Sequence, residues 1–267
     1  MAENISLKEK LDFWYKKTCT PEFTALDPVQ FPRSFKKRED IEIAAILSAT
    51  IAWGRRDMIL RSAKKMFALM ESSPYEFVMS GGYKKFKKSG ITADGKRSGN
   101  IHRTFFESDL FYFCRGFERC YLKYGSLEKL FAQPPNVWES FSLFREEMAK
   151  ANKGKYSIHI ANAGASALTE ENGNASSLTG SACKKLNLAL RWLVRKDAVD
   201  LGLWKKIKLQ SLYIPLDVHV ARAARKLGLL KRKSNDKKAV IELTENLREF
   251  CPDDPVKYDF ALFSMRP

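Results

Sequence analysis

The sequence predicts an all-α protein. Apolar residues recur at the spacing of amphipathic helices through most of the chain, and several of these runs begin at a residue that commonly caps a helix. No segment needs a strand to explain its pattern, and we find neither internal repeats nor a coiled coil. Hydrophobic residues make up 45% of the 267, so the chain can bury a substantial core, as one large domain or as two compact lobes.

The first two helices are predicted by polar residues at their starts. Ser6 is followed three residues later by Glu9, the capping-box pattern, and we expect that helix to end near residues 18–21. After a proline-containing loop, the acidic pair Glu39-Asp40 precedes the apolar run Ile41–Thr50. Acidic residues favour a helix N-terminus, and a helix that is apolar on nearly all faces should be buried.

The middle of the chain combines predicted helices with two irregular segments. Helices are expected over residues 58–70, from residue 74, and over residues 127–131 and 138–148. Residues 81–99 are rich in Lys and Gly and are typical of a mobile basic excursion, and residues 151–177 are typical of a long irregular loop. The dense aromatic residues of 102–124 indicate core packing, with stacking on bases as the less favoured alternative.

Four further helices are expected towards the C-terminus. The apolar run 186–194 is one element. Asp217 precedes a second helix that continues to about Leu227, and Asp236 can cap a third. A last helix is expected after residues 252–255. These helices complete the all-α prediction.

Charge indicates the class of partner. The net charge is +16 at pH 7, and a chain this basic commonly binds nucleic acid, although a solvated lysine-rich surface would give the same number. No apolar run is long enough to span a bilayer, and residues 1–6 lack the order of a signal peptide. We therefore expect a cytoplasmic, nucleoid-associated protein with no membrane partner. The five cysteines are scattered and form no CxxC pair, so we predict no metal site and no cofactor.

Two segments resemble the motifs of a known family. Residues 178–184 read LTGSACK, residues 215–222 read PLDVHVAR, and RKLG follows at 225–228. The helix-hairpin-helix DNA glycosylase superfamily, the endonuclease III and 8-oxoguanine glycosylase group, has a hairpin LPGVGxK in its lyase-active members and opens a later helix with Pro/Ala-Val-Asp-x-His-Val. The second segment is the more specific match, because Thr179 replaces the proline of the hairpin and Ala182 replaces its closing glycine.

Further similarities refine this resemblance. Residues 46–50, ILSAT, are similar to the LLSAQ helix end of the family, and residues 59–67 resemble the helix after it. Family members often place Asn or Gln near Thr50 to fill the gap left by a flipped base, and Thr50 is too short for that role. Only Cys251 lies where the iron–sulfur subgroup has four cysteines, and the long spacing between the two motifs is similar to that of archaeal 8-oxoguanine glycosylases. The chain also resembles an uncharacterised bacterial family known as a domain of unknown function.

The resemblance implies two helical lobes around a cleft, one over residues 39–195 and the other built from residues 1–38 and 196–267. It also implies a DNA glycosylase/AP lyase that excises an oxidised base, with 8-oxoguanine as the leading analogy. Lys184 would be the amine nucleophile that forms a Schiff base with the sugar, and Asp217 would stabilise the cationic sugar. Lys185 is the competing nucleophile, because alignment across the hairpin can slip by one residue.

Backbone N–H groups at the hairpin are expected to bind DNA phosphate. The predicted DNA-binding residues are Gly180, Ser181, Ala182, Lys185, Arg55, Arg56 and Arg222, with Lys231–Lys233 as a further basic cluster. The expected partner is double-stranded DNA with a damaged base. Two alternatives stay open at this stage: a non-catalytic DNA- or RNA-binding protein that retains the fold, and an enzyme that acts on RNA.

The same residues can also have purely structural roles. Taken alone, Lys184 is typical of the many surface lysines of a basic chain. Asp217 is a good helix N-cap, a role worth about 1 kcal/mol, whether or not it is catalytic. His219 is expected to be a packed or capping residue rather than a catalyst. The order of the motifs favours the functional interpretation, which requires Lys184 and Asp217 to meet.

Overall fold

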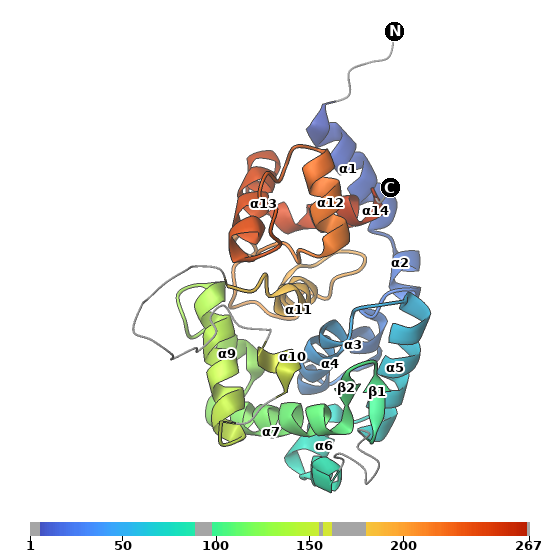
Figure 1. The fold of residues 1–267 in the computed structure, drawn as a ribbon, viewed down its shortest axis with the longest axis vertical. Helices are drawn as coiled ribbons and strands as arrows, with labels where there is room; N and C mark the ends of the chain where they lie inside the picture. Colours follow the sequence, from blue (N-terminus) through green and yellow to red (C-terminus); the bar gives the residue numbers. More distant parts are fainter. Residues whose placement is uncertain (1–5, 89–97, 155–156, 162–179, 266–267) are drawn as a thin grey trace. The chain divides into compact units, whose positions relative to one another are not determined.

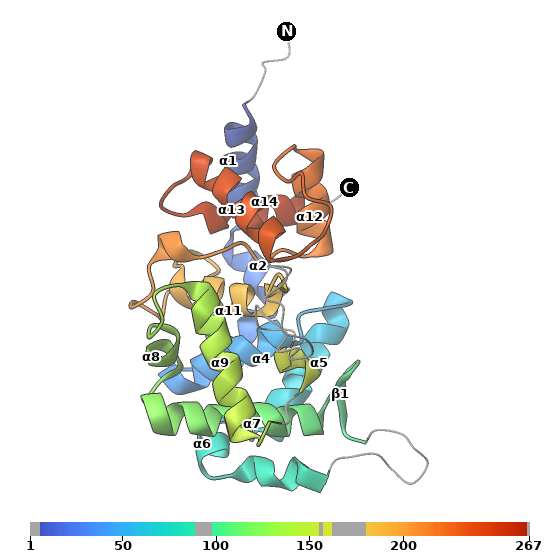
Figure 2. The ribbon, with the colours of Figure 1, turned by 60° about the vertical axis from the view of Figure 1, so that its left-hand side comes forward.

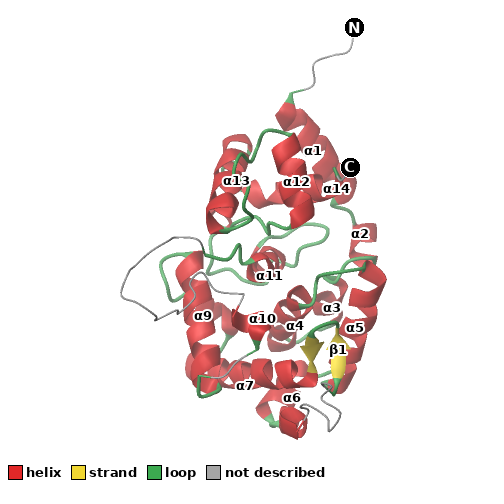
Figure 3. Ribbon diagram, viewed as in Figure 1, coloured by secondary structure: helices red, strands yellow, loops and turns green. Residues whose placement is uncertain are grey.

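The computed structural model of the chain describes residues 6–88, 98–154, 157–161 and 180–265. These residues fall into two compact units: a terminal unit, Met1–Ala25 with Ala165–Pro267, and a central unit, Leu26–Gly164. Both are mostly helical, as the all-α prediction requires (Figure 3).

The expected lobes, residues 39–195 and residues 1–38 with 196–267, stay a prediction. Residues 26–38 belong to the central unit, and the segment that leads into residue 195 belongs to the terminal unit. Within the terminal unit, the residues after helix α11 (Lys184–Val194) fold back on that helix. The N–H of Leu201 donates to the carbonyl of Trp192, and the N–H of Trp204 donates to that of Leu193.

The central unit is built around a buried helix. Its elements are α3 (Gln30–Ser34), α4 (Arg38–Thr50), α5 (Arg56–Leu69), α6 (Pro74–Met79), η1 (Gly82–Lys88), β1 (Asn100–His102), β2 (Phe105–Phe106), α7 (Glu107–Tyr124), α8 (Leu127–Phe131), α9 (Val137–Ala151) and α10 (Ile158–Ala161). Every residue of α4 from Asp40 to Thr50 is buried, as its apolar composition predicts. Burying each of its large aliphatic side chains contributes about 1.5–3 kcal/mol.

Helices α7 and α9 pack against each other and carry much of the aromatic core (Figure 2). Phe113, Phe117 and Phe144 are buried, and the rings of Phe117 and Phe144 lie 6.5 Å apart. The dense aromatic segment therefore packs in the core, as predicted. Gly116 lets the helices approach closely, because a Cβ atom there would lie 1.8 Å from Sδ of Met148.

Three expectations for the central unit are wrong. A short antiparallel ladder joins β1 and β2, although no strand was predicted (Figure 3). Residues 82–88 form the 3₁₀ helix η1 instead of a mobile excursion, because Tyr83 and Phe86 are buried in spite of the lysines around them. In the second irregular segment, 151–177, residues 158–161 form helix α10 and not a loop. Residues 89–97, 155–156 and 162–177 of the two segments lie outside the described residues.

The terminal unit groups the first helix with the last ones. Its elements are α1 (Leu7–Thr18), α2 (Pro21–Ala25), α11 (Lys184–Val194), η2 (Leu209–Ser211), α12 (Val218–Lys226), α13 (Lys237–Phe250), η3 (Pro255–Lys257) and α14 (Tyr258–Ser264). Helix α14 packs against both α1 and α12 (Figure 1). The predicted capping box of α1 is present, since the Ser6 side chain accepts from the N–H of Glu9. Short helices α2 and α3 occupy the segment predicted as a loop, and α3 contains Pro32.

Candidate active site at the start of helix α11

Lys184 is the first residue of α11, and the chain enters this helix through a tight turn. Cys183 has a left-handed backbone conformation, with φ 48° and ψ 36°. Its N–H donates to Oγ of Ser181 over 3.2 Å, and the side-chain amide of Asn187 donates to the carbonyl of Ala182 over 3.0 Å. These bonds fix the turn, so the position of Lys184 is set by the backbone that precedes it.

The described part of the predicted hairpin is attached to α13. The carbonyl of Gly180 accepts a 2.8 Å hydrogen bond from the N–H of Lys237, and Ser181 forms an isolated antiparallel bridge with Asp236. Asp236 also caps α13 through the N–H of Ala239, as predicted. The first two residues of the hairpin motif, 178 and 179, lie outside the described residues.

Asp217 uses its two carboxylate oxygens for different tasks. Its Oδ1 atom accepts hydrogen bonds from the N–H groups of His219 and Val220, both over 2.8 Å, and so caps α12. Its Oδ2 atom lies 3.2 Å from Nζ of Lys184. The predicted N-cap is therefore present, and the fold brings the predicted amine and carboxylate together.

The ion pair of Lys184 and Asp217 lies at the surface of the terminal unit. The Lys184 side chain keeps 31% of its surface exposed and that of Asp217 keeps 18%. Burial raises the pKa of Asp217, but the Lys184 ammonium and the N–H groups that cap α12 outweigh it and hold that pKa below its usual value. Asp217 is thus ionised at neutral pH, and the pair remains accessible to a ligand.

Behind this pair, α11 is anchored by buried charges. Arg191 is 4% exposed, and its Nε atom donates to Asp200 over 3.3 Å. Its Nη1 atom donates to Oδ2 of Asp259 on α14. An arginine inside an otherwise apolar helical run is the sequence signal for such a buried ion pair. Sequence reasoning did not use this signal and missed both Arg191 and Asp259.

A second buried arginine, Arg195, directly follows the last residue of α11. Arg195 donates to Asp200 over 2.9 Å, to Asp254 over 2.8 Å and to the Tyr15 hydroxyl over 2.8 Å. It also pairs with Asp197. The network connects α1 and the segment before α14 to the end of α11. Because Arg195 makes several hydrogen bonds, the C-terminal end of α11, the helix that carries Lys184, is held firmly in place.

The other predicted DNA-binding residues differ in their surroundings. Arg222 on α12 is exposed, and Lys185 is half-buried. Arg55 and Arg56 belong to the central unit, where exposed Arg55 lies 3.1 Å from Asp57. The structure thus brings Gly180, Ser181, Ala182, Lys184 and Lys185 into one segment next to Asp217. Arg55 and Arg56 belong to the central unit and are not part of this segment.

Two further residues of the sequence analysis are Thr50 and His219. Thr50 is buried in the central unit, with 2% of its surface exposed, and its expected inability to fill a base gap stays a prediction. The side chain of His219 is exposed, so the prediction that it packs or caps is wrong. Only its backbone N–H takes part in the cap, because Asp217 supplies the acceptor.

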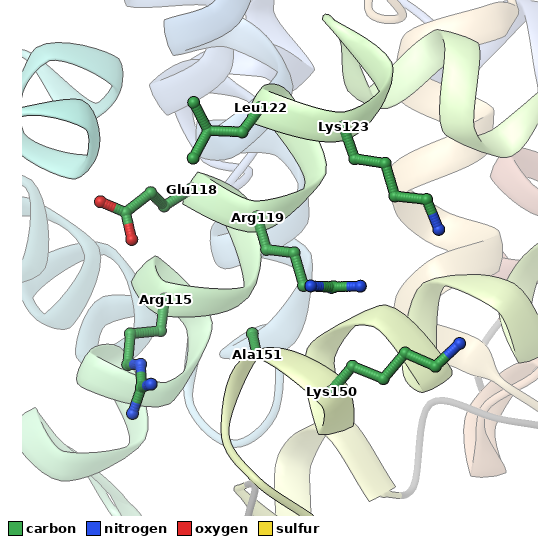
Figure 4. A pocket seen from close by; sticks show the side chains of 7 residues that line it. All are labelled: Arg115, Glu118, Arg119, Leu122, Lys123, Lys150 and Ala151. Carbon is green, nitrogen blue, oxygen red and sulfur yellow. The ribbon is translucent and has the colours of Figure 1, made fainter.

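A pocket on the central unit lies between α7 and α9 (Figure 4). It is lined by Arg115, Glu118, Arg119, Leu122, Lys123, Lys150 and Ala151. Glu147, which is fully buried, accepts from Arg119 over 2.6 Å and from Lys123 over 2.7 Å. Since one buried carboxylate pairs with both cations and joins the two helices, we assign this pocket a structural role.

Within the described ranges, no three His, Cys, Asp or Glu side chains are grouped so that they could hold a metal ion. No helix in that same part of the chain is both long enough and apolar enough to cross a membrane.

Comparison with known proteins gives a family. The chain matches the DUF2400 family, described as a protein of unknown function, over residues 27–266. It belongs to that family. No curated protein and no solved structure matches the chain. Membership agrees with the expected uncharacterised family, and the region shared with DUF2400 contains Lys184, Asp217 and Asp259.

Proposed function

We propose that this DUF2400 protein is a DNA glycosylase/AP lyase that excises an oxidised base, with 8-oxoguanine as the first base to test. The observation that carries the proposal is the 3.2 Å contact between Nζ of Lys184 and Oδ2 of Asp217. The resemblance to helix-hairpin-helix glycosylases, including their two lobes around a cleft, is part of this proposal. The net charge of +16 supports a nucleic-acid partner.

The proposed reaction needs an amine and a carboxylate at one place. The target nucleotide is flipped out of the stack, at a cost of a few kcal/mol. The neutral amine of Lys184 forms a bond to C1′ of the sugar as the bond from C1′ to the base breaks, and the base leaves with the electron pair and takes up a proton. Nζ then loses a proton, and the bond from C1′ to the ring oxygen opens, with protonation of that oxygen. The product is an iminium, the Schiff base.

Asp217 has two tasks in this scheme. Its carboxylate, ionised at neutral pH, stabilises the positive charge that develops on the sugar when the base leaves. Its Oδ2 atom also lies within reach of Nζ of Lys184, where protons must be removed. The cap of α12 holds the carboxylate in place through Oδ1, so orientation does not depend on substrate.

Borohydride trapping tests the proposal. Borohydride reduces the iminium to an amine and leaves a covalent protein–DNA adduct. We expect an adduct with duplexes that contain 8-oxoguanine or an abasic site, loss of the adduct in Lys184→Ala, and retention in Lys185→Ala. Absence of an adduct on a panel of damaged duplexes, with salt-sensitive DNA binding retained, would contradict the enzymatic proposal.

The second candidate is a non-catalytic nucleic-acid-binding protein that retains the fold. The burial of Thr50, 2% exposed, favours it, because a base-flipping enzyme needs a side chain to fill the gap. The replacements at positions 179 and 182 favour it as well. Binding without an adduct would support this candidate. Competition between duplex DNA and structured RNA would then identify the nucleic acid, and stronger binding to RNA would also direct the search for activity to RNA.

A further inference from the structure

The part of the chain that forms α12 and joins it to α13 concentrates positive charge (Figure 1). Residues 218–238 contain eight Lys or Arg and one Asp, so this short stretch carries +7 of the net charge of +16. Lys231 and Lys233 are exposed, and neither forms a salt bridge with an acidic residue that the structure describes. Cations gathered in this way repel one another until an anion compensates them.

Arg225 on α12 holds residues 231–235, which we call the basic loop, in one conformation. Its Nε atom donates to the carbonyl of Arg232 over 2.9 Å. Its Nη2 atom donates to the carbonyl of Lys233 over 2.8 Å and to Oδ1 of Asn235 over 2.6 Å. A guanidinium suits this task, because its planar fork presents several donors in a fixed geometry. Arg225 is half-buried, so these donors are used inside the protein.

Helix α13 and its N-cap also bind the basic loop. The N–H of Lys231 donates to Oε1 of Glu242 on α13 over 2.6 Å. Nε of Arg232 donates to Oδ1 of Asp236, the N-cap of α13, over 2.7 Å. Since both flanking helices hold the loop, its lysines extend from a fixed backbone, and a ligand that binds them does not have to order the loop first.

The basic loop continues into the segment that leads to Lys184. Asp236 forms an antiparallel bridge with Ser181, and the N–H of Lys237 donates to the carbonyl of Gly180 over 2.8 Å. All these residues belong to the terminal unit. A chain of phosphates bound at the loop would therefore border the entry to α11.

We propose that the basic loop is a preformed docking site for the phosphate backbone of a nucleic acid, and that Arg225 is the positioning residue that presents Lys231 and Lys233 to the phosphates. The inference rests on the proposed function for the class of partner, but it requires no reaction at Lys184. Several fixed and exposed cations fit a repeating anion, and contacts to phosphates position a nucleic acid on a protein.

The salt dependence of binding tests the contacts. Fluorescence anisotropy measures the affinity for a short undamaged duplex at several salt concentrations. Lys231→Ala and Lys233→Ala should each reduce the slope of log affinity against log salt by about 0.9, because each removes one phosphate contact. Lys208→Ala is the charge-matched control, since Lys208 is exposed and lies outside residues 218–238, and it should keep the wild-type slope. Wild-type slopes in both loop variants, or binding to vesicles of anionic phospholipid in place of the duplex, would overturn the inference.

A double-mutant cycle tests the positioning role. Arg225→Met should lower the affinity about tenfold, because the loop must then be ordered when the duplex binds. In that background, Lys233→Ala should cause a smaller fold-loss of affinity than in wild type, since the lysine is no longer held in place. Equal fold-losses in the two backgrounds would mean a purely structural role for Arg225 and would overturn its assignment.

Arg225→Lys separates the charge of Arg225 from its geometry. This variant keeps the charge and loses the planar fork, so it should bind as weakly as Arg225→Met. Wild-type affinity in Arg225→Lys would show that charge alone matters and would overturn the positioning role. Circular dichroism checks folding. If Arg225→Met does not fold, Asn235→Ala replaces it, because it removes one of the three acceptors at an exposed position. It should also lower the affinity, and an unchanged affinity would overturn the role of the loop.

The outcome is separable from that of the proposed function. Binding that depends on the loop, without a trapped adduct on damaged DNA, would contradict the enzyme and support the docking site. A trapped adduct together with wild-type slopes in Lys231→Ala and Lys233→Ala would overturn the docking site alone.

Discussion

The Oδ2 atom of Asp217 lies 3.2 Å from Nζ of Lys184, while its Oδ1 atom accepts hydrogen bonds from the N–H groups of His219 and Val220 in the first turn of α12. One carboxylate therefore joins the start of α12 to the start of α11. An ammonium at the first residue of a helix lies at the positive end of the helix dipole, which costs about 0.3–1 kcal/mol. The carboxylate offsets that cost and holds the amine in a defined place.

Asp217 can be tested with two substitutions that separate its tasks. Asp217→Asn keeps an oxygen that accepts the α12 N–H groups but removes the charge, so we expect stability within about 0.5 kcal/mol of wild type. Asp217→Ala also removes the cap and should lose about 1 kcal/mol or more. Both should slow formation of the trapped adduct about 100-fold or more, because both lack the carboxylate. Urea unfolding and single-turnover trapping measure the two effects.

Asn136 supplies the matched control for the cap. Its side chain accepts from the N–H of Glu139 at the start of α9 in the central unit. Asn136→Ala should cost a similar free energy of unfolding and leave the adduct rate unchanged. If Asp217→Asn formed the adduct as fast as wild type, the charge of Asp217 would have no role in the reaction.

Arg191→Met tests the buried anchor of α11. Removing the guanidinium leaves Asp200 and Asp259 buried with fewer partners, and breaking such a pair costs about 3–5 kcal/mol. Arg248→Ala is the control, because Arg248 pairs with the half-exposed Glu245 and should lose about 1 kcal/mol or less. Urea denaturation measures both, and equal losses would show that the buried network contributes no more than a surface ion pair.

Acid should weaken the contacts of α1 with η3 and α14. Burial raises the pKa of Asp12, but hydrogen bonds from Lys8, Lys257 and Tyr258 lower it to about 2, against 3.8 for a free aspartate. Because the folded-state pKa is depressed, Asp12 stabilises the fold above about pH 4 and loses this contribution as the pH falls towards 2. Chemical denaturation at several pH values should show a shallower loss of stability in Asp12→Asn than in wild type over this window. Identical slopes would contradict the assignment.

Gly116→Ala tests the close contact of α7 and α9. The added Cβ atom would meet Sδ of Met148, which is fully buried, so we expect a loss of about 1–3 kcal/mol from overpacking. A second substitution, Met148→Ala, removes the clash. The double variant should therefore be more stable than the sum of the two single losses predicts. If the stability losses of the two single variants simply added in the double variant, the clash between the new Cβ atom and Met148 would not be the cause of the loss in Gly116→Ala.

Nucleic-acid binding should depend steeply on salt. The logarithm of the affinity should fall linearly with the logarithm of the salt concentration, with a slope set by the number of phosphate contacts. If exposed Arg222 on α12 contacts a phosphate, Arg222→Ala should reduce that slope by about 0.9. Lys238→Ala, an exposed residue of α13 that is not among the predicted contacts, is the charge-matched control. Fluorescence anisotropy with duplex DNA at several salt concentrations gives both slopes.

Helix starts were the most predictable part of the fold. Ser6, Asp217 and Asp236 each accept from the first turn of a helix, as local sequence chemistry requires. Elements that depend on tertiary packing were not predictable. The lysine-rich 3₁₀ helix η1 forms because two aromatic side chains are buried, and the β1–β2 ladder is too short to leave an alternating pattern.

The candidate site was predictable only in part. Lys184 and Asp217 each lie at a helix start that carries a motif, so sequence reasoning could pair them. The residues behind the pair, Arg191 and Asp259, carry no motif, and their burial against each other comes from tertiary packing. Such properties arise when α11, α12 and α14 pack together. A single sequence does not encode that arrangement in any local pattern.

Peptide mapping of the borohydride-trapped complex tests the central proposal most directly. Wild-type protein is trapped on 8-oxoguanine and abasic-site duplexes, the DNA is digested, and tandem mass spectrometry locates the modified lysine. We expect the sugar-derived mass on Lys184 and an unmodified Lys185. A modification on Lys185 or on a lysine of another segment, or no covalent adduct with any damaged duplex, would contradict the assignment of Lys184 as the nucleophile.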